Sequence, residues 1–142
     1  MEQLELLDET GRYPHADALV KTLALLMNEL GLADRELTLV LMDDAAIAEH
    51  NRADRGEDGP TDVLSYPTSE PGDSGFPQVP HLGDVLISLD TAQRQANGQG
   101  HSLHAEVLTL AAHGLTHLRG YDHQTEPEWA PFHAAQERVL QL

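Results

Sequence analysis

Cysteine is absent from this chain of 142 residues. The absence excludes disulfide bonds and thiolate metal sites, so a transition-metal site would have to be built from imidazole and carboxylate groups. A chain without cysteine is also consistent with an intracellular protein.

Long apolar runs are missing as well. No stretch approaches the roughly 20 apolar residues that a membrane-spanning helix requires. The first residues, MEQLELLDETGRY, have neither the basic nor the apolar segment of a secretory signal. We therefore expect a soluble, unprocessed, cytoplasmic protein with no membrane partner.

Basic residues are scarce. Eight Lys and Arg residues stand against 24 Asp and Glu residues, which gives a formal net charge of −16. This is the opposite of the broad positive surface that nonspecific nucleic-acid binding uses. The charge argues against a polyanion partner, and DNA is not expected. A local cationic groove or a bound metal ion can still allow an acidic protein to bind RNA.

The apolar fraction of 40% supports one hydrophobic core, and residues 1–142 are expected to form a single domain. Strands are predicted at residues 3–8, 36–42, 61–67 and 82–88. Helices are predicted at residues 14–30, 44–52, 91–98, 103–119 and 125–142. Polar loops are predicted at residues 52–60 and 68–81. The order predicts an α/β (α+β) protein with a single mixed sheet of about four strands covered by helices.

Several helix starts carry capping signals. Asp43 or Asp44 can cap the second helix, Ser88 or Asp90 the third, and Ser102 the fourth. In the last helix, residues 125 and 128 are Thr and Glu, the spacing of a capping box, and a proline at residue 131 can delay or kink the helix start.

Residues 113–123, HGLTHLRGYDH, contain three histidines. On a helix, His113 and His117 project within roughly 40° of each other. Gly120 can take the left-handed conformation that ends a helix, which allows the chain to return and present His123 as a third ligand. Three neutral imidazoles suit Zn²⁺ and leave a fourth position for water, as in catalytic zinc sites. The sequence thus places a candidate metal motif on a central helix.

The same histidine spacing occurs in metzincin peptidases, whose helix reads H-E-x-x-H with Glu as the general base. Here that position is Gly114. Without a carboxylate beside the metal-bound water, the residues favour a metal-dependent hydrolase of another substrate class. Asp122 or Glu106 could orient a ligand or accept a proton, and a helix-surface or capping role explains both equally well. Five other histidines lack such partners and are expected at the surface or in the core: His15, His50, His81, His104 and His133.

The segment HGLTHLRGYDH matches the form H-G-x-x-H-L-x-G-Y-D-H and resembles the YbeY endoribonucleases, also called rRNA maturation factors. The segments TDVLSYP, LGDVLIS and GHSLHAEV resemble other blocks of that family in the same order, so the likeness spans most of the chain. Arg119 departs from the family pattern, which usually has an apolar residue there.

The resemblance implies that His113, His117 and His123 bind one zinc ion, and that His113 and Arg55 are catalytic residues of one cleft. It also implies a single-strand-specific endoribonuclease that acts in rRNA maturation and small ribosomal subunit quality control. The expected partners are precursor rRNA, the small subunit and its associated factors. Without the resemblance, Arg55 is better explained as a solvated charge among Asp54 and its acidic neighbours.

Phosphodiester cleavage needs an activated nucleophile and positive charge around the phosphate. Zinc can lower the pKa of bound water to about 7, and an arginine can bind a phosphate through two parallel hydrogen bonds. Weaker candidates are Asp84, which interrupts an apolar strand, and Thr61 and Ser65, which could contact phosphate. Two alternatives remain open at this point: a metallopeptidase-like hydrolase, and a noncatalytic ribosome-assembly factor with a structural metal.

Overall fold

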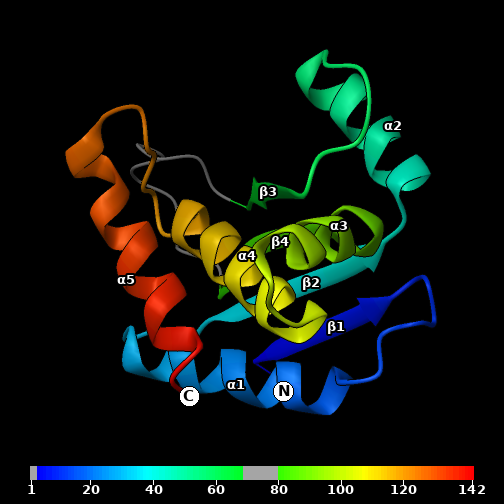
Figure 1. Cartoon of the computed structure of the whole chain (residues 1–142). Helices are drawn as coiled ribbons and strands as arrows, with labels where there is room; N and C mark the ends of the chain where they lie inside the picture. The colour runs from blue at the N-terminus through cyan, green and yellow to red at the C-terminus, as the bar shows by residue number, and fades with distance from the viewer. Residues whose placement is uncertain (1–2, 69–79) are drawn as a thin grey trace.

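A computed structural model describes residues 3–68 and 80–142 of the chain (Figure 1). Its strands are β1 (Leu4–Asp8), β2 (Glu36–Met42), β3 (Val63–Pro67) and β4 (His81–Ser88). Its helices are α1 (Ala16–Glu29), α2 (Asp44–Arg55), α3 (Leu89–Gln99), α4 (Leu103–Leu118), the 3₁₀ turn η1 (Glu126–Trp129) and α5 (Ala130–Val139). The order of strands and helices agrees with the sequence prediction. The predicted loop at residues 69–79 lies outside the described residues.

The four strands form one mixed sheet in the order β1-β2-β4-β3. The strands β1, β2 and β4 are parallel, and β3 pairs with β4 in the antiparallel direction at one edge. The α/β class and the mixed four-stranded sheet are therefore confirmed.

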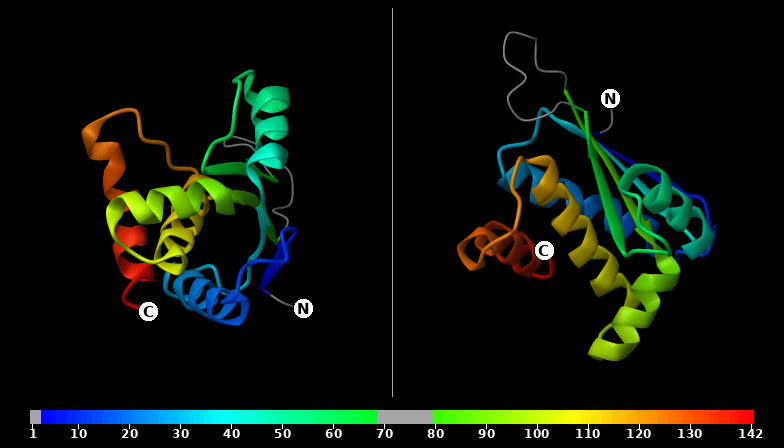
Figure 2. Two further views of the ribbon diagram at one scale, coloured as in Figure 1. Left: turned by 45° about the vertical axis from the view of Figure 1, so that its right-hand side comes forward. Right: turned by 90° about the horizontal axis from the view of Figure 1, so that it is seen from above.

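Helices cover the two faces of the sheet unequally (Figure 2). Val85 and Ile87 of β4 point into the main core, which also contains the buried residues of α1 and α4. Leu86 points to the opposite face, where it packs with Ile47 of α2 in a smaller cluster. The alternation follows from the period of two residues along a strand. The helix with the histidine motif, α4, thus lies between the sheet on one side and other helices on the other.

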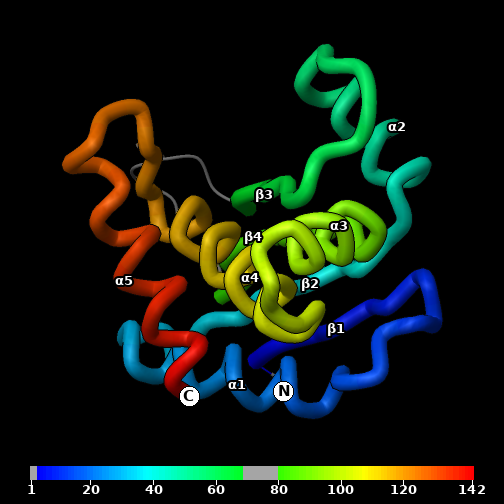
Figure 3. The backbone as a smooth tube through the Cα atoms, in the orientation of Figure 1, coloured from blue at the N-terminus to red at the C-terminus, as the bar shows by residue number. Residues whose placement is uncertain are grey.

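The C-terminal helix α5 packs beside α1 and α4, although α1 is far away in the sequence (Figure 3). Phe132, Ala135 and Val139 are its buried residues. At its end, Arg138 donates two hydrogen bonds, of 2.8 and 2.6 Å, to the carboxylate of Glu29. The apolar face packs α5 against α4, and the bidentate contact ties the end of α5 to α1.

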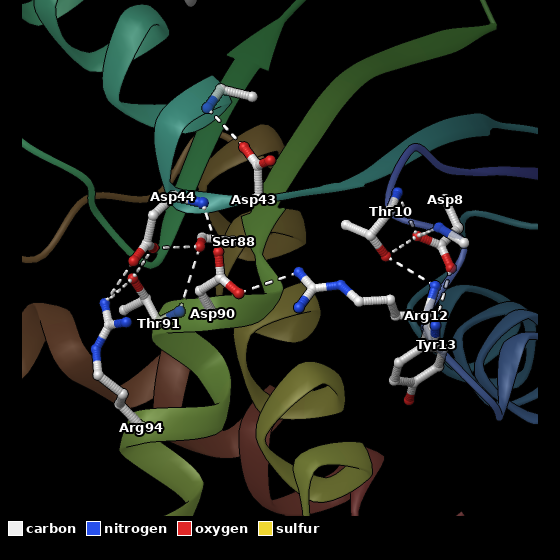
Figure 4. Close-up of polar contacts among 12 residues, drawn as sticks. Asp8, Thr10, Arg12, Tyr13, Asp43, Asp44, Ser88, Asp90, Thr91 and Arg94 are labelled. Atoms are coloured by element: carbon white, nitrogen blue, oxygen red, sulfur yellow. Dashed lines mark hydrogen bonds and ion pairs between the residues drawn. The ribbon is translucent and has the colours of Figure 1, made fainter.

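Polar contacts join the helix starts that follow β2 and β4 (Figure 4). The hydroxyls of Ser88 and Thr91 each donate to Oδ1 of Asp44 at 2.7 Å. Asp90 accepts from the backbone N–H of Asp44 at 2.9 Å and from Arg12 at 3.0 Å. These contacts hold together the carboxyl ends of the two central strands.

The helix caps are mostly as predicted. The side chains of Asp43, Ser88 and Ser102 accept hydrogen bonds from backbone N–H groups in the first turns of α2, α3 and α4. The predicted capping box of the last helix is wrong: Thr125 makes no capping bond and instead donates its hydroxyl to the Glu128 carboxylate at 2.8 Å. Prolines in the first turns of η1 and α5 accompany this 3₁₀ start, and the regular helix begins only at Ala130.

The second helix is longer than predicted. It runs to Arg55 and ends at Gly56, whose φ of 67° is in the left-handed region. Arg55 therefore lies on the last turn of a helix rather than in the polar loop assigned to residues 52–60. Among the described residues, no helix has the length and apolar character needed to cross a bilayer.

Candidate metal centre

The structure brings His113, His117 and His123 together in one group, called here the histidine cluster. One ring nitrogen from each lies within 4.8 Å of those from the other two. The ring centroids are separated by 4.9, 5.1 and 4.9 Å, so the three imidazoles form a nearly equilateral triangle. All three are half-buried. Such a triangle of ring nitrogens matches the arrangement in which three histidines share one metal ion.

A glycine turn brings the third histidine back to the helix. The helix α4 ends at Leu118, and Gly120 has a φ of 100°, which is strained for any residue with a side chain. Its backbone N–H donates to the carbonyl of His117 at 2.9 Å. The predicted left-handed role of Gly120 is confirmed, and the chain then places His123 beside the helix.

The backbone after this turn also selects the tautomer of His117. Its Nδ1 lies 3.1 Å from the carbonyl oxygen of Tyr121. A carbonyl can only accept a hydrogen bond, so Nδ1 carries the proton and Nε2 keeps a free lone pair. A metal-binding histidine usually has this second contact, which fixes the ring and directs the other nitrogen to the metal.

Aromatic side chains of α5 and of the 3₁₀ turn before it cover one side of the histidine cluster. The ring of Phe132 is fully buried, and its centroid lies 4.8 Å from the centroid of each of the three imidazoles. Trp129 stacks on His123 with a centroid distance of 3.9 Å and an interplanar angle of 15°. These two aromatic residues restrict the orientation of the imidazoles and cover one side of them.

Neither aromatic residue was predicted from the sequence to lie at the site. Trp129 and Phe132 stand three positions apart, a spacing typical of one helical face. Their partners, however, come from α4 and from the loop that follows it. His133, expected at the surface or in the core, is exposed and stacks on Trp129 with a centroid distance of 5.6 Å.

The electrostatic environment favours the neutral form of two of the three imidazoles. Burial lowers the pKa of His113 to about 4, and the neighbouring His117 and His123 add to this effect, while Asp62 opposes it. Burial is also the main reason that the pKa of His117 is lowered. A metal ion needs the unprotonated imidazole. Two of the three candidate ligands are therefore in the binding form at neutral pH, and this set of donors is of the kind that fits zinc.

Gly114 has a packing role that the sequence did not reveal. A Cβ atom at this position would lie 2.6 Å from Cγ1 of Val85 and 3.1 Å from Oγ of Ser65. The Ser65 hydroxyl donates to the Gly114 carbonyl at 3.3 Å. Position 114 therefore faces the sheet, and a glutamate side chain there would enter the interface between α4 and the sheet.

Arg55 lies at the end of α2, exposed to solvent. Its positive charge acts on the ring of His117, where it helps to lower the pKa after burial and His123. Tyr66 of β3 donates a hydrogen bond of 2.6 Å to Asp54, which ties this end of α2 to the sheet edge. Among the residues that the structure describes, none forms an ion pair with Arg55.

The other candidate residues from the sequence are not members of the histidine cluster. Glu106 is buried and pairs with His101 at 2.5 Å, about 10 Å along the helix from His113, so it does not orient a ligand. Asp84 pairs with His81 at 3.6 Å on the sheet, away from the helix motif. Asp122 accepts from the backbone N–H of His123 at 2.8 Å, and its charge acts on the His117 ring. The Thr61 hydroxyl donates to Asp62, whose charge reaches His113.

The fold and the histidine cluster define the class: an α/β protein with a candidate three-histidine metal centre formed by its central helix and the loop after it. The family described as "YbeY: Endoribonuclease YbeY" matches residues 9–142. The chain belongs to this family.

Individual relatives agree with the family match. The protein named "Endoribonuclease YbeY" from Thermus thermophilus is 54% identical over 122 residues, which cover 86% of each chain. Its namesake from Deinococcus radiodurans is 50% identical over 129 residues, covering 83% of this chain and 82% of the relative. The solution structure of TM1509 from Thermotoga maritima superimposes with a TM-score of 0.67 at 23% identity, covering 97% and 89% of the two chains. At that identity the structural match supports the fold alone.

Proposed function

We propose that this chain is a zinc-dependent, single-strand-specific endoribonuclease. In this proposal residues 1–142 form one metal-dependent hydrolase domain of the cytoplasm, which acts on precursor rRNA in ribosome maturation and small-subunit quality control. The observation that carries the metal-dependent part is the triangle of imidazoles, in which Nε2 of His117 is left free by the Tyr121 carbonyl. The family and its relatives named as endoribonucleases support the substrate class.

The histidine cluster would hold the zinc ion. When bound, zinc supplies a water of lowered pKa and positive charge beside the phosphate. Two features of the surroundings favour metal binding. Phe132 covers one side of all three rings, and burial favours the unprotonated form of His113. His113 is assigned as a catalytic residue because it would contact the cofactor directly.

Arg55 is the proposed phosphate-binding residue. Its guanidinium has no ion-pair partner among the described residues, and its charge reaches His117. A guanidinium matches the geometry of two phosphate oxygens and supplies charge that the phosphate needs as it is attacked. Because the whole molecule carries a net charge of −16, the positive charge of Arg55 would offset the repulsion between the protein and a bound phosphate.

The test is to measure zinc by elemental analysis and to assay cleavage of single-stranded RNA, duplex RNA and casein. We expect about one zinc ion per chain and cleavage of single-stranded RNA alone. His113→Ala and Arg55→Glu should lose cleavage. Arg52→Glu, at an exposed arginine on the same helix, is the matched control and should retain it.

Each other outcome contradicts a part of the proposal. Absence of zinc, with no activation by added zinc, contradicts the metal site. Full activity of Arg55→Glu contradicts the role of Arg55. RNA binding without metal-dependent cleavage supports a noncatalytic assembly factor instead, and casein hydrolysis supports a peptidase. The His113→Ala protein, purified in parallel, controls for contaminating nucleases.

A further inference from the structure

Gln136 of α5 contacts the histidine cluster at His113, whereas the Tyr121 carbonyl contacts it at His117. Its side-chain nitrogen Nε2 lies 3.0 Å from Nδ1 of His113. Gln136 follows Phe132 by four residues, so both side chains project from one face of α5 toward α4. One helical face therefore supplies the ring under the cluster and a polar contact to one of its members.

The contact to His113 differs chemically from the contact to His117. The Tyr121 carbonyl can only accept, which fixes the proton of His117 on Nδ1. A glutamine amide has both an NH₂ donor and a carbonyl acceptor, and a half-turn of its terminal bond exchanges them. Gln136 can therefore serve either tautomer of His113.

The two tautomers differ in metal binding. When the amide NH₂ donates to Nδ1, the proton of neutral His113 is on Nε2, which then cannot bind a metal. When the amide oxygen accepts from Nδ1–H, Nε2 has a free lone pair. Because Gln136 occupies Nδ1 in either case, Nε2 is the nitrogen of His113 that remains for a ligand, as in His117.

We propose that Gln136 is a positioning residue of the metal centre, whose amide oxygen accepts the Nδ1–H bond of His113 when a metal ion occupies Nε2. This inference rests on the zinc site of the proposed function. It gives the C-terminal helix a defined role, since α5 then orients the histidines in two ways: His113 through Gln136, and all three rings through Phe132. The bidentate contact of Arg138 with Glu29 holds this helix in place.

The experiment compares zinc affinity, by competition with a chelator, for wild type, Gln136→Leu and Gln136→Glu. The leucine has no acceptor and should weaken binding roughly 10–100-fold, the usual effect of losing a partner of a metal-binding histidine. The glutamate can only accept, so it should bind within a few-fold of wild type. Gln93→Leu is the matched control, since Gln93 is also a helical glutamine with one side-chain hydrogen bond, to Asn97, and should leave affinity unchanged.

Two further measurements separate positioning from general loss of structure. The visible absorption of the Co²⁺-substituted protein should change in Gln136→Leu and not in Gln93→Leu. Thermal unfolding of the metal-free proteins should be nearly the same for Gln136→Leu and wild type. Gln136→Met, whose side chain is close in length to glutamine, replaces the leucine variant if that variant does not fold.

An affinity of Gln136→Leu equal to wild type, with an unchanged Co²⁺ spectrum, overturns the role of Gln136 while leaving the zinc site and the nuclease intact. Equal losses in Gln93→Leu also overturn it. If the wild-type protein binds no zinc when no chelator is present, both this inference and the proposed metal site are wrong. Failure of the Gln136 role alone can therefore be distinguished from failure of the metal site.

Discussion

Gly114 lacks a side chain at the place where α4 crosses Val85 and Ser65. Sequence comparison with peptidase helices gives this glycine a chemical meaning, since the position holds no general base. The structure adds a steric reason, because a Cβ atom would come within 2.6 Å of a valine methyl. One glycine thus allows the helix with the histidines to approach the sheet closely.

At the residue scale, Gly114→Ala should destabilise the protein. Overpacking against Val85 should lower the free energy of unfolding by about 1–3 kcal/mol, measured by urea denaturation of the metal-free protein. Gly98→Ala on α3 is the control: nothing lies within 4 Å of its added Cβ, and the helix should gain about 0.5–1 kcal/mol. Equal changes in the two variants would contradict the steric argument.

A second prediction follows from the lowered pKa of His113, which is about 4 in the folded protein against 6.5 ordinarily. Between these pH values the unfolded chain binds more protons at this residue than the folded chain does. The free energy of unfolding of the metal-free protein should therefore fall as the pH is lowered from 6.5 to 4. His117, whose pKa is also lowered, contributes with the same sign.

The measurement is the melting temperature of metal-free wild type and His113→Phe at several pH values in this window. The phenylalanine removes one titrating group, so the variant should lose less stability than wild type between pH 6.5 and 4. Parallel curves for the two proteins would show that His113 does not titrate with the expected shift.

At the scale of elements, the short C-terminal helix has the most direct influence on the site. A helix of 10 residues is too short to be stable alone, so α5 depends on packing for its structure. In return its Phe132 contacts the rings of all three histidines. The order of α5 and the geometry of the histidine cluster are therefore coupled.

This coupling predicts that Phe132→Leu weakens zinc binding by roughly tenfold, the lower end of the effects seen when support of metal ligands is lost. Chelator competition gives the affinity, and urea denaturation gives the stability. Val139→Ala, which shortens another buried side chain of α5, is the control. It should lower stability while leaving zinc affinity near that of wild type. Loss of affinity in both variants would assign the effect to the whole helix instead of the ring.

Helix ends also show which local signals can be read without a structure. Asp43, Ser88 and Ser102 cap their helices as predicted, because a cap depends on residues within one turn. The capping box at Thr125 was predicted from equally local spacing and is wrong. Here prolines in the first turns and the packing of Trp129 against His123 favour a 3₁₀ turn, and that packing is not a local property.

For the whole molecule, the charge of −16 limits how RNA can be bound. Of the eight basic residues, Arg55 acts on His117 and Arg119 lies between His117 and His123 in the chain, so we expect about two phosphates to be neutralised there. The affinity for single-stranded RNA should therefore depend weakly on salt, with a slope of log K against log salt of about −1.4 for two contacts.

Fluorescence anisotropy of a labelled RNA strand between about 50 and 200 mM salt measures this slope. Arg55→Glu should reduce its magnitude by about 0.7, the contribution of one phosphate contact on a single strand. Arg52→Glu again serves as the comparison. A slope several times steeper would indicate a broad basic surface, contrary to the composition.

The sequence by itself determined the α/β class, the order of the elements and the three histidines of the candidate site. These features depend on hydrophobic period, on glycine conformation and on the spacing of ligands within 11 residues. The left-handed turn at Gly120 belongs with them, because φ is a property of a single residue.

Only the tertiary structure decided which residues surround those histidines. Phe132 and Gln136 reach the cluster because α5 packs across α4, and Arg55 acts on His117 because α2 extends to the sheet edge. Glu106 shares the helix of His113 but pairs with His101 at its other end. Contacts between segments distant in the chain depend on how helices pack, and a local pattern of residues contains no record of that packing.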